Sequence, residues 1–87
     1  MGNLTFTENA WEEYLYWQTQ DKKTLKRINQ LLQDISRNGF EGIGKPEPLK
    51  GDFSGFWSRR IDETNRIVYR LSGENIEIIQ CKGHYKD

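Results

Sequence analysis

Three closely spaced strand signals in the C-terminal third of the chain constrain its fold most. β-Branched and aromatic residues are dense over Phe56–Ile61, Arg66–Leu71 and Ile76–Cys81. The breaks between them, Asp62–Asn65 and Ser72–Asn75, consist of turn-forming residues and have the length of hairpin connections. These spacings predict three consecutive antiparallel strands. Because a sheet needs only one face for its core, the arginines on these strands raise the question of what the other face does.

Alternation along the middle strand divides its side chains between the two faces. Ile67, Tyr69 and Leu71 are predicted to share one face, which leaves Arg66, Val68 and Arg70 on the other. In the preceding strand Arg59 and Arg60 are adjacent, so one of them must point to each face. The face that carries the arginines is expected to stay open to a ligand.

Two helices are predicted before these strands, after a short strand at Leu4–Phe6. Thr7 and Asp21 suit the N-caps of the two helices, and Gly39 suits the end of the second. Helical spacing gives the first helix a stripe that we interpret as core: Trp11, Tyr14, Leu15 and Trp17. The second helix has a continuous apolar stripe: Leu25, Ile28, Leu31, Leu32 and Ile35. The pattern predicts an α+β fold in which two N-terminal helices pack on one face of a small, mainly antiparallel β-sheet.

Length and charge limit what such a fold can be. The chain has 87 residues, enough for a single domain over residues 1–87 with one core. Thirteen basic and thirteen acidic residues cancel, so any binding to a polyanion must come from a local patch. Four basic residues in the first turns of the second helix form one cluster, which we interpret as a solvated face in preference to a contact with a phosphate-rich partner: Lys22, Lys23, Lys26 and Arg27.

Cysteine use and hydropathy point to the cytoplasm. Cys81 is the sole cysteine, so no internal disulfide can form, which is typical of a reducing compartment. No apolar run approaches membrane-spanning length, and the N-terminus lacks the design of a signal peptide. We therefore expect a cytoplasmic protein without a membrane contact.

The segment between the helices and the three strands contains both prolines of the chain. Pro46 and Pro48 remove backbone donors on both sides of Glu47, so this segment cannot be a central strand or the interior of a helix. Residues before proline are driven to extended conformations, so Lys45 and Glu47 are expected in a stiff loop that presents them outward. Glu47 is then either an ordinary exposed glutamate or a carboxylate held for function, and both interpretations stay open.

The ionisable residues that the non-core side can share are a carboxylate, two arginines and the single histidine: Glu47, Arg60, Arg66 and His84. Cleavage of RNA without a metal needs one group to take the proton of the ribose 2′-hydroxyl and another to protonate the departing 5′-oxygen. It also needs fixed cations to hold the negative charge of the phosphorane. Arginine offers two parallel donors to phosphate oxygens, and histidine is a usable acid near neutral pH.

Each of these residues also has a simpler interpretation. A lone histidine near a C-terminus is commonly a surface residue, and sheet arginines are commonly solvated or paired, here with Glu77 or Asp62. A zinc site is not indicated, because one histidine and one cysteine have no partners at ligand spacing. No serine has the glycine pattern of a nucleophile elbow, which argues against acyl transfer.

Four motifs together resemble the YoeB toxins of the RelE/ParE superfamily: GKPEPLK, SGFWSRRI, RIVYR and the late HY. With the earlier WEEYLYWQTQDKKTLKRINQLLQDI, the resemblance covers the chain from about Phe6 to Tyr85. It implies a RelE-like, microbial RNase-like α+β fold. It also implies a toxin of a type II toxin–antitoxin system, a ribosome-dependent endoribonuclease (mRNA interferase) that cuts messenger RNA in the ribosomal A site and stops translation.

The resemblance also assigns roles to residues. The general base falls on Glu47, the phosphate-stabilising arginine on Arg66, the general acid on His84 and the substrate-positioning aromatic on Tyr85. The implied product is a 2′,3′-cyclic phosphate with a released 5′-hydroxyl, formed without a metal or other cofactor. One departure is that Lys86–Asp87 follow Tyr85, where the family chain usually stops. The basic residues expected to contact RNA or phosphate are Lys45, Lys50, Arg59 and Arg60.

The implied partners are the bacterial ribosome, messenger RNA and an antitoxin of the YefM type. A disordered acidic segment of that antitoxin would fold across the arginine face. Members of the family can also form homodimers. Two alternatives are a non-catalytic RNA- or protein-binding module and a ParE-like toxin that inhibits gyrase. The second is disfavoured because ParE-like relatives generally lack the counterparts of Glu47 and His84.

Overall fold

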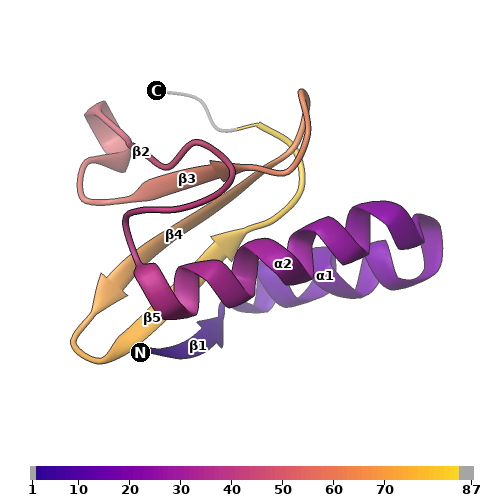
Figure 1. Ribbon diagram of the computed structural model, residues 1–87, viewed down its shortest axis with the longest axis horizontal. Coiled ribbons are helices and arrows are strands. Elements are labelled where there is room, and N and C mark those ends of the chain that lie inside the picture. Colours follow the sequence, from indigo (N-terminus) through magenta and orange to yellow (C-terminus); the bar gives the residue numbers. More distant parts are fainter. Residues whose placement is uncertain (1, 85–87) are drawn as a thin grey trace.

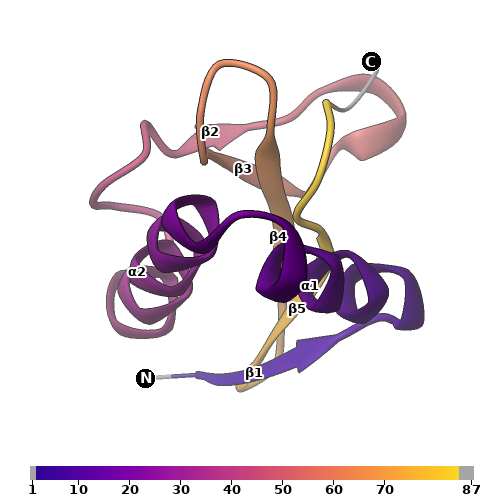
Figure 2. The same cartoon turned by 90° about the vertical axis from the view of Figure 1, so that its right-hand side faces the viewer.

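Two helices lie across one face of a five-stranded sheet in the computed structural model, which describes residues 2–84 (Figure 1). Figure 2 looks along the two helices, which lie side by side in front of the long strands. In chain order the elements are β1 (Asn3–Phe6), α1 (Glu8–Gln20), α2 (Lys22–Asn38), β2 (Glu47–Pro48), the 3₁₀ turn η1 (Gly51–Phe53), β3 (Trp57–Arg60), β4 (Arg66–Ser72) and β5 (Asn75–Gln80). The predicted α+β class with two N-terminal helices on one face is confirmed.

The sheet has the strand order β1-β5-β4-β3-β2. The three predicted C-terminal strands are confirmed as β3, β4 and β5, each within a residue or two of its predicted ends and each antiparallel to the next. β1 returns to the opposite edge and pairs in parallel with β5. The two-residue β2 pairs antiparallel with β3 at the other edge. The sheet is therefore mixed but mainly antiparallel, as predicted.

The predicted helix boundaries follow from their capping residues. The Thr7 hydroxyl accepts a hydrogen bond from the Ala10 N–H at 3.2 Å, and the Asp21 carboxylate accepts from the first free N–H groups of α2. Gly39 closes α2 with a φ of 66°, a conformation that glycine adopts without steric cost. Within residues 2–84, neither helix combines the length and the apolar character that crossing a membrane would need.

The core lies between the helix pair and the inner face of the sheet. The stripe of α2 packs there against Ile67 and Tyr69 of β4, and both of these side chains are fully buried. Trp17 of α1 is buried as well, and its indole N–H donates to the Cys81 carbonyl at 2.9 Å. Leu71 shares the inner face of β4 by alternation but is 44 % exposed, so the end of this strand extends beyond the helical cover.

The prediction that the whole aromatic stripe of α1 belongs to the core is only partly right. Trp17 is buried, but Trp11 is 46 % exposed and Leu15 43 % exposed. Trp11 instead stacks on Tyr14, with ring centroids 5.7 Å apart, at the molecular surface. The reason is helical geometry: six residues correspond to about 600° of rotation, which places Trp11 and Trp17 on different sides of the helix.

Candidate active site

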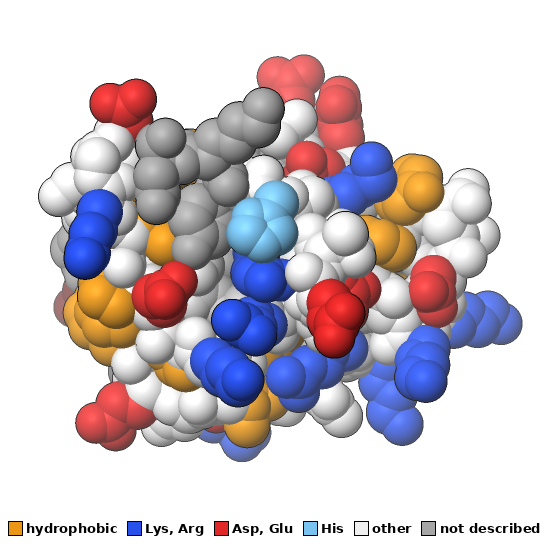
Figure 3. All heavy atoms as spheres, turned by 90° about the horizontal axis from the view of Figure 1, so that it is seen from above, with side chains coloured by type: hydrophobic (Ala, Val, Ile, Leu, Met, Phe, Trp, Pro, Cys, Tyr) orange, Lys and Arg blue, Asp and Glu red, His pale blue; other side chains and the backbone are white. Residues whose placement is uncertain are grey.

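A hollow of about 310 Å³ lies on the side of the sheet away from the helices. That volume is at the lower end of the range for ligand sites, about 300 to 1,000 Å³. Figure 3 looks onto this side: the histidine side chain lies in the middle of the view, with Lys and Arg side chains gathered beneath it. The lining residues come from the loop before β2, β2 itself, β3, the start of β4 and the segment after β5: Lys45, Pro46, Glu47, Pro48, Ser58, Arg60, Arg66 and His84.

Glu47 reaches the hollow because β2 is an edge strand. It pairs with Ser58 of β3, and the following Leu49 is buried and donates its N–H to the Phe56 carbonyl at 2.9 Å. Since only one side of an edge strand is hydrogen-bonded, the two flanking prolines cost no sheet hydrogen bonds there. The prediction that this segment cannot be a central strand is confirmed. The Glu47 side chain is exposed at the rim.

Two arginines face each other across β3 and β4. Arg60 is the register partner of Arg66, an arrangement of like charges that is unfavourable without an anion nearby. Arg66 is only 8 % exposed, and its Nη1 donates to the carbonyls of Asp62 and Asn65 at 2.5 and 3.1 Å. Those two carbonyls fix the orientation of the guanidinium group.

The described ion pairs do not include Arg66. Within residues 2–84 they are Arg59–Asp34 and Arg70–Glu77. The expectation that a sheet arginine pairs with Glu77 is therefore met by Arg70, which lies outside the hollow. Arg66 contacts the main chain of Asp62 and has no carboxylate partner in the described part of the chain. A largely buried cation without a carboxylate is suited to bind an anionic group of a ligand.

His84 is brought to the hollow by the segment that follows β5. The Gly83 N–H donates to Asn65 Oδ1 at 2.7 Å, and the Gly83 carbonyl accepts from the Arg66 N–H at 3.0 Å. These bonds attach the segment to the turn between β3 and β4. His84 follows immediately and is exposed. Tyr85, predicted as a site residue, lies outside the described residues.

The structure thus gathers Glu47, Arg66 and His84, together with Lys45 and Arg60, around one hollow. These residues come from four separate segments of the chain. Lys50 is exposed directly before η1 and is not among the residues that line the hollow.

Arg59 was predicted to contact RNA or phosphate, and here the prediction is wrong. Its side chain is fully buried on the helix side of the sheet, and its hydrogen bonds use all five guanidinium N–H groups. The acceptors are the Tyr69 hydroxyl, the Asp34 carboxylate and the carbonyls of Gly39, Glu41 and Ile43. The hydrogen bond from Arg59 lowers the pKa of Asp34 from its ordinary value of 3.8.

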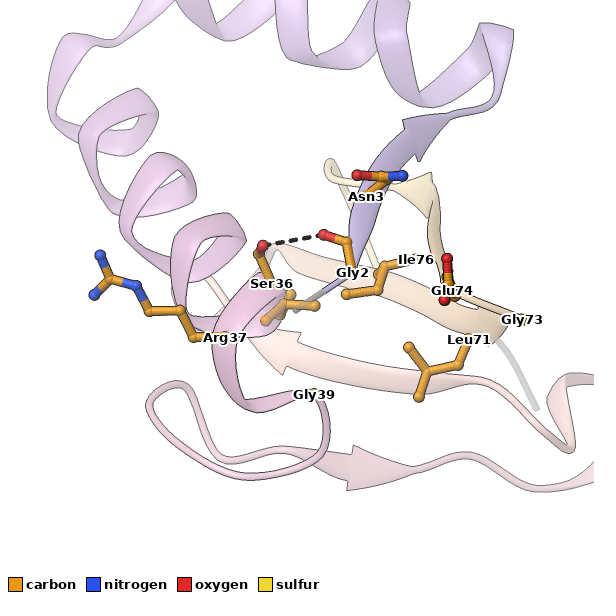
Figure 4. A pocket seen from close by; sticks show the side chains of 10 residues that line it. Gly2, Asn3, Ser36, Arg37, Gly39, Leu71, Gly73, Glu74 and Ile76 are labelled. Carbon is orange, nitrogen blue, oxygen red and sulfur yellow. Dashed lines mark hydrogen bonds between the residues drawn. The ribbon is translucent and has the colours of Figure 1, made fainter.

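A larger hollow, of about 530 Å³, lies elsewhere and has different chemistry. It is formed by the start of the chain, the end of α2 and the turn between β4 and β5 (Figure 4). Its charged residues are Arg37, whose side chain points away from the hollow, and Glu74. In residues 2–84 no three histidine, cysteine, aspartate or glutamate side chains come together as metal ligands would. Of these two hollows in the described part of the chain, only the smaller one brings together an acid, a base and several cations.

Residues 6–85 match a known family described as the YoeB-like toxin of the bacterial type II toxin–antitoxin system. Toxin YoeB of Streptomyces coelicolor is 54 % identical to this chain over 82 residues, which is 94 % of this chain and 98 % of that protein. Toxin YoeB of Escherichia coli K12 is 51 % identical over 82 residues, with the same shares of the two chains.

Solved structures agree with these sequence matches. A heterotetrameric YoeB–YefM toxin–antitoxin complex from Staphylococcus aureus contains a chain 50 % identical to this one, with a TM-score of 0.87. The match covers 98 % of this chain and 99 % of that chain. A YoeB dimer from the same organism is also 50 % identical, with a TM-score of 0.88, covering 97 % of this chain and 98 % of that chain.

Proposed function

Since this chain belongs to the YoeB-like toxins of bacterial type II toxin–antitoxin systems, we propose that it is a ribosome-dependent endoribonuclease. The substrate is messenger RNA in the ribosomal A site, and the consequence of cleavage is inhibition of translation. Family membership suggests the toxin class, and the residues around the hollow support the chemistry. The cytoplasm is the compartment in which it would act, because translating ribosomes are there.

The reaction proceeds in one displacement at phosphorus. The Glu47 carboxylate accepts the proton of the ribose 2′-hydroxyl while the 2′-oxygen attacks the adjacent phosphorus. The bond from phosphorus to the 5′-oxygen breaks, and the protonated His84 imidazole gives its proton to that oxygen. The products are a 2′,3′-cyclic phosphate and a 5′-hydroxyl. Solvent then removes the proton from Glu47 and returns one to His84, so the enzyme is regenerated.

Arg66, Arg60 and Lys45 stabilise the extra negative charge on the phosphorane. The observations support this role best for Arg66. It is 8 % exposed, its guanidinium group is held by two backbone carbonyls, and it has no carboxylate partner in residues 2–84. A donor that is already oriented needs no reorganisation when charge develops in the transition state. Arg60 lies opposite it in the register, so an anion between the two relieves the repulsion of like charges. Tyr85 is proposed to position the substrate base.

The test is cleavage of messenger RNA on programmed, translating ribosomes, with cut sites mapped on the message. Glu47→Ala and His84→Gln should each lower the single-turnover cleavage rate by about 10²- to 10⁴-fold, the usual contribution of a positioned acid or base. Glu41→Ala is the matched control, because Glu41 is exposed in the loop before β2 and does not line the hollow. It should cut at the wild-type rate.

Near-wild-type cutting by both Glu47→Ala and His84→Gln would overturn the assignment of base and acid. Retention of RNA without scission by the wild-type protein would favour the alternative, a binding module. Such binding would weaken steeply with salt, because it depends on contacts to phosphates.

We also propose an antitoxin of the YefM type as the partner that restrains the toxin, and a homodimer as one of its assembly states. The relatives support both, since solved structures of Staphylococcus aureus proteins are described as a YoeB–YefM complex and as a YoeB dimer. An acidic antitoxin segment over the hollow would neutralise the same cations that the reaction needs.

A further inference from the structure

We propose that Asn65 is a positioning residue that holds His84 at the hollow, a role that rests on the proposed function of His84 as general acid. Asn65 is not among the residues that line the hollow. It is the last residue of the turn between β3 and β4, and it joins that turn to the segment that carries the histidine.

The orientation of the Asn65 amide is fixed from both of its ends. Its Nδ2 donates to the two carboxylate oxygens of Asp62 at 3.2 and 3.1 Å, and its Oδ1 accepts from the Gly83 N–H at 2.7 Å. Because a carboxylate accepts and an N–H donates, the two contacts agree on which end of the amide is which. The opposite orientation would place the amide oxygen against the Asp62 carboxylate and the amide nitrogen against the Gly83 N–H.

Asp62 is itself part of the support. Its Oδ1 also accepts from the N–H groups of Thr64 and Asn65 at 2.8 and 2.7 Å. Burial opposes ionisation of this carboxyl, but the hydrogen bonds from Asn65 and Thr64 outweigh it and lower the pKa of Asp62. An ionised Asp62 therefore holds the turn, and the turn holds Asn65.

The segment after β5 is held at two places before it reaches His84. At the first, the Cys81 N–H donates to Glu13 Oε1 of α1 at 2.8 Å. At the second, two residues further on, Gly83 bonds both to the Asn65 side chain and to the Arg66 N–H. Gly83 has a φ of 81°, so the chain changes direction here in a conformation that suits glycine. The Asn65 side chain thus binds Gly83, which directly precedes the proposed acid His84. Asn65 itself directly precedes Arg66, the proposed phosphate ligand.

Loss of this contact should act on the chemical step. A displacement of about 1 Å at a reacting group can cost about 100-fold in rate, even when the change lies outside the reacting groups themselves. Asn65→Ala removes both the acceptor for Gly83 and the donor for Asp62. Asn65→Asp keeps an acceptor for Gly83 but replaces the donor with a second carboxylate oxygen beside the Asp62 carboxylate. Glu63→Ala changes an exposed neighbour in the same turn and serves as the matched control.

The experiment measures single-turnover cleavage of ribosome-bound messenger RNA at increasing toxin concentration, with hydrogen exchange of the Gly83 amide followed by NMR. Asn65→Ala should lower the maximal rate by about tenfold or more, with half-saturation at an unchanged concentration. It should also increase the exchange rate of the Gly83 amide. Asn65→Asp should also cut more slowly than the wild type, because its carboxylate would lie against the ionised Asp62. Glu63→Ala should match the wild type in both measurements.

A double-mutant cycle separates this role from a general structural one. If Asn65 acts through His84, Asn65→Ala should have almost no further effect in a His84→Gln background. An equal reduction in both backgrounds, or wild-type cutting by Asn65→Ala, would overturn the proposal. If the proposed function itself is wrong, the wild type and His84→Gln would both leave the messenger RNA uncut. In that case unchanged exchange of the Gly83 amide in Asn65→Ala would overturn the anchoring role independently.

Discussion

At the scale of single residues, the adjacent arginines Arg59 and Arg60 lie in different environments and have different roles. They are neighbours on β3, yet Arg59 is enclosed among five hydrogen bonds and Arg60 lines the hollow. Alternation in a strand makes this separation unavoidable. One arginine stabilises the fold, and we assign the other to the substrate.

Substitution of each arginine by methionine should separate the two roles. Arg59→Met removes the cation paired with Asp34 and the guanidinium donors to three carbonyls, so it should lower the free energy of unfolding by about 3 to 5 kcal/mol. Arg60→Met should leave stability within about 0.5 kcal/mol, as at most surface positions, and slow cleavage instead. Urea unfolding and the ribosome assay measure the two effects. Equal stability losses for both variants would contradict the assignment.

The sequence was sufficient to predict that one arginine points to each face, but not which one. That choice depends on register: Arg59 lies opposite Ile67, a core residue, while Arg60 lies opposite Arg66. Register is set by tertiary packing, which periodicity alone does not contain. Asn65 was missed for a similar reason, because its contact with Gly83 joins residues 18 positions apart.

At the scale of elements, the loop between α2 and β2 decides where Glu47 lies. Arg59 binds the carbonyls of Gly39, Glu41 and Ile43, and the Gly44 carbonyl accepts from the Arg60 N–H at 2.6 Å. The strands and helix caps were predictable because their signals are local. The conformation of the loop could not be predicted in the same way. Its carbonyls are bound by Arg59, which follows them in the chain by 16 positions or more.

Gly44 is a closely packed point of this loop. Its φ is 81°, and an added Cβ would lie 2.6 Å from Leu31 Cδ2 and 3.2 Å from the Arg60 carbonyl. Gly44→Ala should therefore lower the free energy of unfolding by more than about 1 kcal/mol in urea titrations, and it should slow cleavage. Gly51→Ala is the control, since its φ is 64° but nothing lies within 4 Å of the added Cβ. If the two variants lose the same stability, close packing of the loop is not the cause.

At the scale of the whole molecule, the two faces of one sheet have separate tasks. The helices bury the inner face, and the outer face gathers a carboxylate, an imidazole and cations from four segments. The chain has no net charge, so its attraction to RNA has to be local. The predicted strands and the proline-flanked loop already suggested that these residues share the outer face, and the resemblance to a known family supplied their expected roles. The inner packing of Arg59 and the exposure of Trp11 required the structure.

The central claim is that the ribose 2′-hydroxyl of the message is the nucleophile. Glu47 accepts the proton of this hydroxyl, and His84 gives a proton to the departing 5′-oxygen. It is tested most directly with a ribosome-bound message that carries a single 2′-deoxynucleotide at the mapped cut site. We predict that the all-ribose message is cut to a 2′,3′-cyclic phosphate and a 5′-hydroxyl, and that the substituted message stays intact at that position. Cleavage of the substituted message at the same position and rate would contradict the mechanism.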